Sequence, residues 1–312
     1  MNKEKILITG GSGFVGTNLI NQLSNSKYDV FSLDIAEPKK ITQEINYISM
    51  DIRSKKIEDL IKKINPSIII HLAAQASVSI SSKNPQLDND INLNGSLNLF
   101  LNSINSELKK FIFFSTGGAI YGEKIGKKFD ENDLPKPLSP YGISKLNFEN
   151  YLNYFSSQGI SKSEITILRP SNIYGPWQNP DGEAGVVSIF ANKMLKKEDV
   201  SIFGSGDEYR DYIYVDDIIN FIFKVLNSKI IGTYNLSSGI STKTIEIFDK
   251  VSDYLGYKNS PVFYDKREGD IFGIELDNSK SKSLGWDLKI NLKGGLSNTI
   301  NFLKEDNKHL FR

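Results

Sequence analysis

Cysteine is absent from the 312-residue sequence, and histidine occurs only twice, as His71 and His309. The lack of cysteine excludes disulfides, cysteine-based zinc sites and thiol nucleophiles, and it is compatible with a reducing compartment. Two histidines that lie far apart in the sequence also exclude a histidine-rich metal site. The chemistry of this chain therefore has to come from other side chains, and we expect no metal.

Long hydrophobic runs are missing as well. No stretch of 18 apolar residues occurs, and the apolar run near the N-terminus is too short for a signal peptide. The formal net charge is only +1, so the sequence lacks the basic excess that is typical of nucleic-acid-binding proteins. We therefore expect a cytoplasmic chain that binds neither a membrane nor nucleic acid.

Short apolar runs alternate with helical patterns over the first 170 residues. Continuous apolar strands separated by helices are typical of a parallel sheet that is covered on both faces. The sequence thus predicts an α/β protein with a doubly wound parallel (Rossmann) sheet. The predicted strands are 29–34, 45–50, 66–72, 110–115 and 164–169, after a first strand at 6–8, and the predicted helices include 56–64, 85–104 and 141–155.

The sequence changes in character after Pro170, where proline and glycine become frequent. We predict that residues 1–170 form a dinucleotide-binding domain to which the chain returns at about 207–236. Residues 171–206 and 237–312 are predicted to form a smaller C-terminal α/β domain that binds the substrate.

Three glycines follow the first strand with the spacing Gly10-x-x-Gly13-x-x-Gly16, and an apolar helical pattern begins at Phe14 and Val15. Glycine permits a tight turn and a close approach of the backbone to a ligand. The N–H groups at the start of a helix attract anionic oxygens. A strand, a glycine turn and a helix in this order predict a binding site for a pyrophosphate.

Asp34 ends the second predicted strand, 18 residues after Gly16. A carboxylate at this position accepts hydrogen bonds from the ribose hydroxyls of an adenosine and repels a 2′-phosphate. Because no arginine stands beside it, the sequence favours NAD over NADP. Asp51 and Ile52, which follow the third strand, are candidates to flank the adenine; otherwise they are a loop acid and a core residue.

Tyr141 and Lys145 are four residues apart in a predicted helix and therefore share a face. A cation beside a phenol stabilises the phenolate, so the pair predicts a tyrosine that works as a general acid and base nearer to neutral pH. A surface Tyr–Lys pair without function is the alternative interpretation of the same spacing.

Together these motifs resemble those of the extended short-chain dehydrogenase/reductase family, and within it those of the nucleotide-sugar 4-epimerases. The resemblance extends over almost the whole chain. Its blocks are TGGSGFVG at 9–16, HLAAQASV at 71–78, DINLNGSLNL at 90–99, STGGAIYG at 115–122, PYGISK at 140–145, RPSNIYGPWQ at 169–178, IFGSGDEYRDYIYVDD at 202–217, YNLSSG at 234–239 and REGD at 267–270.

The resemblance implies bound NAD and inversion at C4 of a nucleotide sugar through a 4-keto intermediate. Tyr141 then matches the catalytic base, and Lys145 matches the lysine that holds the nicotinamide ribose. The family's triad is completed by a serine or threonine, but an ungapped alignment on the final Tyr-Gly places Gly117 at that position. We therefore predict that Thr116 supplies the hydroxyl, with Ser115 as the alternative.

Further contacts are implied by the same resemblance. Leu72, Ala73 and Ala74 are expected to line the cofactor, and Ser171 to lie near the nicotinamide amide. The expected substrate contacts are Thr116, Asn172, the phosphate-binding Arg210 and Arg267, Asp270 near the nucleoside ribose, and Ile274 beside the sugar's C2 substituent. His71 is interpreted as a structural residue, since Tyr141 already supplies a base.

Sister activities of the family are the main alternatives. A 4,6-dehydratase carries an Asp-Glu pair directly after the loop threonine, whereas Gly117 and Gly118 stand here. A 4-ketosugar reductase or a uronate decarboxylase shares the Tyr–Lys pair and stays possible, as does a non-catalytic NAD-binding protein. The intermediate size of Ile274 predicts that both UDP-hexoses and UDP-N-acetylhexosamines are accepted. The family also implies a homodimer, formed through the helices around 87–104 and 141–155.

Overall fold

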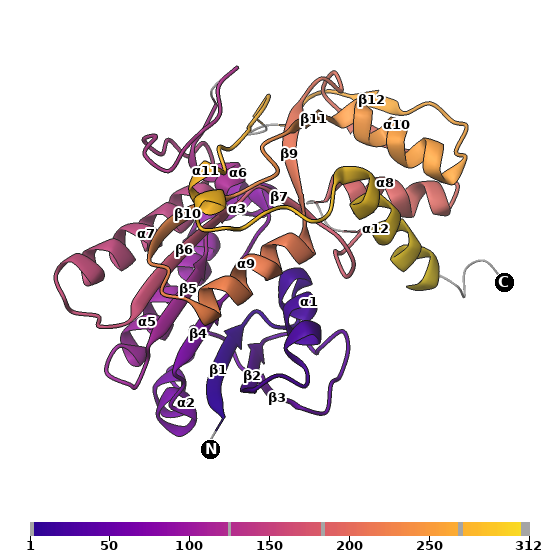
Figure 1. Ribbon diagram of the computed structural model, residues 1–312. Coiled ribbons are helices and arrows are strands. Elements are labelled where there is room, and N and C mark those ends of the chain that lie inside the picture. The colour runs from indigo at the N-terminus through magenta and orange to yellow at the C-terminus, as the bar shows by residue number, and fades with distance from the viewer. Residues whose placement is uncertain (1–2, 124–125, 182–184, 268–270, 307–312) are drawn as a thin grey trace.

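The predicted parallel sheet is present in the computed structural model, which describes residues 3–123, 126–181, 185–267 and 271–306. Seven strands pair in the order β10-β6-β5-β4-β1-β2-β3, and every pairing is parallel. The doubly wound α/β fold is thus confirmed (Figure 1). The strands are β1 (Glu4–Thr9), β2 (Tyr28–Asp34), β3 (Ile45–Ser49), β4 (Ile68–His71), β5 (Lys110–Phe114), β6 (Glu164–Pro170) and β10 (Gly232–Leu236).

Alternate residues of the central strands point into two separate hydrophobic clusters, one on each face of the sheet. Leu7 packs with Ile61, Phe100 and Phe148, whereas its neighbour Ile6 packs in the cluster on the other face. The first face is covered by α2 (Ile57–Ile64), α5 (Ser96–Ser103) and α7 (Pro140–Ser157), and the second by α1 (Phe14–Leu23) and α9 (Val215–Asn227). Continuous apolar strands are therefore needed, because both faces are buried.

The long helical region predicted for 85–104 is confirmed, but its pitch changes within it. The chain forms α3 (Val78–Lys83), then α4 (Pro85–Asn89), a π-helical segment η1 (Asp90–Gly95) and α5. Wider π turns commonly occur at functional sites. The apolar pattern did not reveal the change of pitch, because a few residues of π-helix hardly alter the spacing of the apolar positions.

The remaining strands lie outside the main sheet, beyond the ends toward which its strands point (Figure 1). They form a three-stranded sheet in the order β11-β9-β7 and a two-stranded sheet of β12 and β8. These elements are β7 (Asn172–Tyr174), β8 (Ser201–Phe203), β9 (Tyr209–Tyr214), β11 (Ser241–Lys243), β12 (Val262–Tyr264), α8 (Val186–Leu195), α10 (Thr244–Leu255), α11 (Ser279–Ser283) and α12 (Leu292–Asp306). Among the described helices, none is both long and apolar enough to cross a membrane.

A buried ion pair links α7 to the sheet. Arg169 of β6 donates from Nε to Glu149 Oε1 at 3.0 Å and from Nη2 to Glu149 Oε2 at 2.5 Å. Its Nη1 donates to the Tyr121 hydroxyl at 2.7 Å, which in turn donates to Asn235 Oδ1 of β10. The buried charges of Arg169 and Glu149 thus have each other as partners, as burial away from water requires. The network holds α7, which carries Tyr141 and Lys145, at a defined position on the sheet.

Candidate active site

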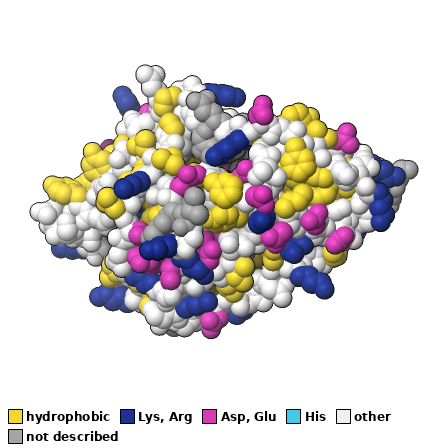
Figure 2. Space-filling model, turned by 90° about the horizontal axis from the view of Figure 1, so that it is seen from above, with side chains coloured by type: hydrophobic (Ala, Val, Ile, Leu, Met, Phe, Trp, Pro, Cys, Tyr) yellow, Lys and Arg dark blue, Asp and Glu magenta, His cyan; other side chains and the backbone are white. Residues whose placement is uncertain are grey.

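The predicted site residues gather at one edge of the sheet. Gly10, Leu72, Ser115 and Ser171 each follow the last residue of a parallel strand, and Asp34 is itself the last residue of β2. The carboxyl ends of parallel strands meet at one edge, which is where open α/β sheets bind ligands. Figure 2 views the molecule from this side and shows acidic and basic side chains intermixed with apolar patches rather than a field of one sign.

The glycine loop leaves room for a ligand at one of its three glycines. Gly10 has φ +75°, and a Cβ on it would lie 2.6 Å from the backbone nitrogen of Ala73. A Cβ on Gly16 would overlap the carbonyl oxygen of Gly10. Gly13 is exposed, and a Cβ there would meet only the Gly10 oxygen, at 3.2 Å. Packing therefore requires glycine at 10 and 16, whereas Gly13 faces open space.

The start of α1 has the properties of an anion site. Its N-cap residue Gly13 has no side chain to cap the first N–H groups, and the first turn contains no acidic residue. Phe14 and Val15 open the helix and are partly buried against the core. The free N–H groups and the positive end of the helix dipole point toward the loop. These features fit the pyrophosphate of a dinucleotide.

Asp34 is held beside the glycine loop by two backbone amides. Its Oδ2 accepts from Ser12 N at 2.9 Å and its Oδ1 from Ala36 N at 3.0 Å. A carboxylate oxygen accepts more than one hydrogen bond, so both oxygens keep capacity for ribose hydroxyls. The position fits the predicted adenosine ribose.

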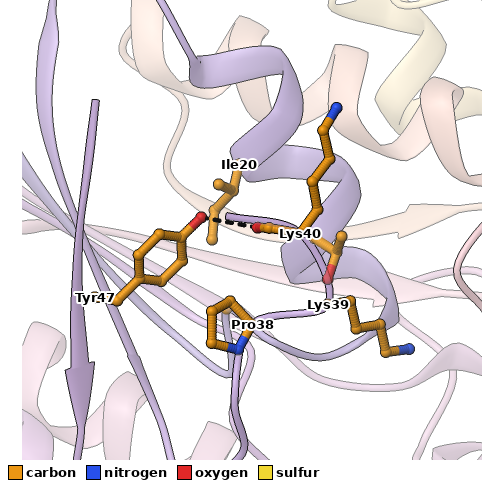
Figure 3. A pocket seen from close by; sticks show the side chains of 7 residues that line it. Ile20, Pro38, Lys39, Lys40 and Tyr47 are labelled. Carbon is orange, nitrogen blue, oxygen red and sulfur yellow. Dashed lines mark hydrogen bonds between the residues drawn. The ribbon is translucent and has the colours of Figure 1, made fainter. Parts of the chain in front are cut away.

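A small hollow lies behind the glycine loop, between α1 and the segment that follows Asp34 (Figure 3). Tyr47 closes one side, where its hydroxyl donates to the carbonyl oxygen of Lys40 at 3.1 Å. The Lys39 ammonium donates to the carbonyl oxygen of Trp177 at 2.6 Å. This bond connects the segment after β2 to the loop after β7, so chain from both parts of the molecule borders the adenosine side of the site.

Asp51 and Ile52 have different surroundings. Asp51 forms an ion pair with Arg53, with 2.6 Å between Nη2 and Oδ2, and the side-chain hydrogen bond from Arg53 lowers the pKa of Asp51. Ile52 is buried, and its side chain lies 2.9 Å from the place of a Cβ on Gly95 in η1. Ile52 thus packs in the core, while Asp51 lies at the surface of the predicted adenine site.

Helix α7 positions the predicted catalytic pair. Ser139 caps it by accepting from Gly142 N at 3.2 Å, and Pro140 occupies its first turn. Lys145 is buried, and its ammonium lies 4.5 Å from the centre of the Phe113 ring. Burial lowers the pKa of Lys145 to about 7, and the carboxylates of Glu149 and Asp88 act in the opposite direction.

Tyr141 does not have the lowered pKa that the Tyr–Lys spacing predicts. Burial raises the pKa of Tyr141 to about 12, a hydrogen bond with Thr116 opposes this rise, and the charge of Asp88 adds to it. The physical reason is that the phenolate loses hydration in this site.

Two residues of the STGGAIYG loop, Thr116 and Ser115, were the candidates for the triad hydroxyl, and Gly117 occupies the aligned position. Thr116, which directly precedes α6 (Gly117–Ile120), is the one whose side chain interacts with Tyr141 and opposes the rise of the Tyr141 pKa. The Ser115 hydroxyl is buried without a partner among the described residues. A Cβ on Gly117 would overlap Leu276 and lie 2.9 Å from the carbonyl oxygen of Arg169. Any side chain at 117 would therefore point into packed protein instead of the site.

Asn172, the first residue of β7, lies close to the STGGAIYG loop. A Cβ on Gly118 would be 3.5 Å from Asn172 Oδ1 and 3.9 Å from Thr116 Oγ1, so Gly118 separates these two polar groups. Ser171, one residue earlier, is buried and donates from its hydroxyl to Asp211 Oδ1 at 3.2 Å. The chain after β6 thus places the Asn172 side chain near Thr116, while the preceding residue, Ser171, is hydrogen-bonded to Asp211 of β9.

The predicted phosphate ligands, Arg210 and Arg267, contact other groups of the chain. Arg210 donates from Nη2 to the carbonyl oxygen of Ile271 at 2.9 Å, and from Nη1 to those of Tyr209 and Phe272 at 2.9 and 3.3 Å. Arg267 is exposed, and its guanidinium carbon lies 3.8 Å from the centre of the Phe203 ring. Within the part of the chain that the structure describes, both guanidinium groups keep N–H donors without a hydrogen-bond partner.

Ile274 and Asp270 complete the predicted substrate set. Ile274 is 1% exposed and packs with Ile120, Tyr121, Phe129 and Leu276. Its side chain therefore belongs to the cluster behind the STGGAIYG loop, and its gatekeeper role stays a prediction. Asp270 lies outside the described residues.

His71 has the structural role that the sequence suggested. Its Nδ1 is 2.7 Å from Thr9 Oγ1 and its Nε2 is 2.8 Å from Ser96 Oγ. Because Ser96 donates its own proton to the carbonyl oxygen of Asn92, Nε2 carries the hydrogen of a neutral imidazole. Burial, together with the charge of Lys145, lowers the pKa of His71 to about 3.

One buried polar cluster beside the Tyr–Lys pair was missed. It consists of Gln75, Asp88, Asn92 and Ser144. The only signal in the sequence is the pairing of Asp88 and Asn92, four residues apart in an otherwise apolar helical pattern. That signal is weak, because polar residues at helical spacing usually face solvent.

We expect Gly117→Ser to destabilise the protein by about 1–3 kcal/mol through overpacking. Gly118→Ser is the matched control and should keep the free energy of unfolding near that of the unchanged protein, because a Cβ there meets no atom closer than 3.5 Å. Urea unfolding of both variants measures the difference. Equal stability of the two would contradict the assignment of Gly117 to the packed interior.

Known proteins share both the sequence and this geometry. A sequence model of the NAD dependent epimerase/dehydratase family matches residues 6–237. A putative UDP-glucose 4-epimerase of Methanocaldococcus jannaschii is 38% identical, over 97% of this chain and 99% of that protein.

Two solved structures superpose closely. The UDP-glucose 4-epimerase of Thermotoga maritima, crystallised with UDP-glucose, has a TM-score of 0.93 and 38% identity, over 97% of this chain and 99% of that one. The UDP-N-acetylglucosamine 4-epimerase of Methanobrevibacter ruminantium, in complex with UDP-N-acetylmuramic acid, has a TM-score of 0.91 and 28% identity, over 98% and 100% of the two chains. The chain belongs to the NAD dependent epimerase/dehydratase family of extended short-chain dehydrogenases/reductases.

Proposed function

We propose that this chain is an NAD-dependent nucleotide-sugar 4-epimerase that inverts C4 of a UDP-hexose or UDP-N-acetylhexosamine through a 4-keto intermediate. The placement of Tyr141, Lys145 and the Thr116 side chain together at the carboxyl edge of the sheet is the observation that carries the proposal. It brings a general acid/base and a second hydroxyl within reach of one sugar hydroxyl. The two solved 4-epimerases that superpose on the chain support the same reaction.

The residues present fit NAD. Gly13 and the free N–H groups of α1 would hold the pyrophosphate, Asp34 would hold the adenosine ribose, and Lys145 the nicotinamide ribose. When bound in its oxidised form, NAD supplies a hydride acceptor and a positive charge that favours the phenolate of Tyr141. We propose further contacts from Gly10, Leu72, Ala73, Ala74 and Ser171, and the adenine between Asp51 and Ile52.

The proton chemistry falls to Tyr141. It accepts the proton of the 4-hydroxyl as the C4–H bond is oxidised, and returns that proton after the 4-keto sugar has turned over in the site. Thr116 keeps the sugar oxygen within reach of the phenol. Because the same group takes and gives the proton, the enzyme ends each turnover in its starting state.

The diphosphate has to stay fixed while the sugar turns. We propose that Arg210 and Arg267 bind it, since guanidinium groups match phosphate oxygens, and that Asn172 contacts the sugar nucleotide beside Thr116. Arg210 would use N–H donors that its bonds to the 271–272 backbone leave free. Asp270 is proposed near the nucleoside ribose.

The sister activities fit the loop less well. Elimination across C5–C6 needs an added acid and base, and the positions after Thr116 are Gly117 and Gly118. A reductase needs net cofactor turnover and more often uses NADP, which the carboxylate of Asp34 disfavours. A non-catalytic NAD-binding protein would have no use for the Tyr141–Thr116 pair.

The test is NMR of the purified protein with UDP-, dTDP- and GDP-sugars and no added reductant. We expect C4 inversion of UDP-glucose and UDP-N-acetylglucosamine without net NADH. Tyr141→Phe should lower kcat by about 10²- to 10⁴-fold, because the phenol transfers the proton. Release of CO₂, accumulation of NADH or an unaffected Tyr141→Phe variant would contradict the assignment. Turnover of UDP-glucose alone would refute only the predicted role of Ile274.

A homodimer is the proposed assembly. On α7, Ile143, Tyr151 and Tyr154 are 43–54% exposed and lie on one face of the helix. Ile80, Leu87 and Leu101 add exposed apolar side chains from α3, α4 and α5, and α7 contacts the first two of these helices. Exposed apolar groups on neighbouring helices are typical of a protein interface.

We expect light scattering to give about twice the chain mass of 35.0 kDa. The double variant Tyr151→Glu/Tyr154→Glu should give the single mass, because it buries two charges in the proposed contact. The control, Tyr254→Glu on α10, removes an exposed tyrosine far from these helices in the fold and should leave the mass unchanged. A double variant that keeps the mass of the unchanged protein would exclude this interface.

A further inference from the structure

Asp88 of α4 is a fully buried carboxylate that the proposed reaction does not use. Its Oδ2 accepts from Ser144 Oγ at 2.6 Å, and its Oδ1 accepts from Gln75 Nε2 at 2.8 Å and Asn92 Nδ2 at 3.0 Å. All three donors are neutral. A buried carboxylate held by neutral groups alone is costly to the fold, which calls for an explanation at this position.

Its partners belong to three segments that border the candidate active site. Ser144 stands between Tyr141 and Lys145 on α7, and Gln75 follows the Leu72–Ala74 segment. Asn92 lies in η1, where its amide bonds to both backbone groups of Gln75, at 2.9 Å each. Asp88 therefore connects the catalytic helix to the loop expected behind the cofactor.

The charged groups around Lys145 also connect Asp88 to the catalytic pair. Glu149 and Asp88 are the carboxylates that favour its ammonium, His71 beside it is neutral, and the Phe113 ring contacts it. Glu149 exerts the larger influence of the two carboxylates, but it is already paired with Arg169. Asp88 has no cation as a hydrogen-bond partner among the described residues, and it is the second carboxylate that favours the Lys145 ammonium.

We propose that Asp88 is a positioning residue for the reaction: it anchors Ser144 between Tyr141 and Lys145, and so places a buried carboxylate beside the turn of α7 that carries both. The inference rests on the proposed function for the role of the pair, but it can be measured without it. Without Asp88, Lys145 would lose a carboxylate that favours its ammonium, and α7 would lose its link to the loop after β4.

Two variants separate charge from hydrogen bonding. Asp88→Asn removes the charge and keeps the shape; its amide can donate to Ser144 Oγ, which then donates to the carbonyl oxygen of Tyr141 at 3.0 Å. Ser144→Ala removes the hydrogen bond and keeps the charge. The control is Asp217→Asn. It neutralises another fully buried carboxylate, on α9, which accepts hydrogen bonds from the backbone N–H groups of Lys289 and Ile290.

The first readout is NMR titration of the ¹³Cε signal of Lys145, assigned by its loss in Lys145→Arg. In Asp88→Asn we expect the midpoint of the Lys145 titration to lie about one pH unit lower. At a given pH above the midpoint, this shift corresponds to a roughly tenfold smaller fraction of ammonium. The alkaline limb of the pH profile of kcat should move with it. Asp217→Asn should lower the melting temperature and leave both midpoints in place.

An unchanged midpoint in folded Asp88→Asn would overturn the proposal. If that variant does not fold, Ser144→Ala decides: a fall in kcat of about tenfold with KM unchanged supports the anchoring role, and unchanged kcat overturns it. If the unchanged protein inverts no sugar, the proposed function fails, while the Lys145 titration still tests the role of Asp88.

Discussion

The burial of the Lys145 ammonium is the constraint around which the site is organised. An ammonium deprived of water needs negative charge nearby, and Asp88 and Glu149 supply it from two helices. Glu149 in turn needs Arg169, whose remaining donors hold Tyr121 and, through it, β10. Burial, together with the same ammonium, keeps His71 neutral. One buried charge is thus linked to residues on α4, α7, β4, β6 and β10.

The parallel sheet brings the site residues together. Its strands end at one edge, where the glycine loop, Asp34 and the STGGAIYG loop lie next to the start of α7. Packing decides which groups face the ligand: Gly13 is open whereas Gly10 and Gly16 are not, and Thr116 contacts Tyr141 while a side chain at Gly117 would not fit. Glycine therefore leaves open space at position 13, whereas at positions 10, 16 and 117 it is required by close packing.

Much of this could be predicted from the sequence, because local patterns determine it. Apolar strands with intervening helices predict the sheet, and the strand–glycine–helix order predicts the pyrophosphate site. The raised pKa of Tyr141 could not be predicted, since it depends on burial that spacing does not report. The role of Asp88 was hidden for a similar reason: its three donors are 13, 4 and 56 residues away in the chain. The π turn that places Asn92 among them left no trace in the apolar pattern.

The central claim is that hydrogen leaves C4 of the sugar and returns to the same carbon, while Tyr141 handles only the hydroxyl proton. UDP-glucose carrying deuterium at C4 tests this claim most directly when turnover is followed by NMR in ordinary water. The account predicts that the inverted product keeps its deuterium at C4. Replacement of that deuterium by hydrogen from water would contradict it.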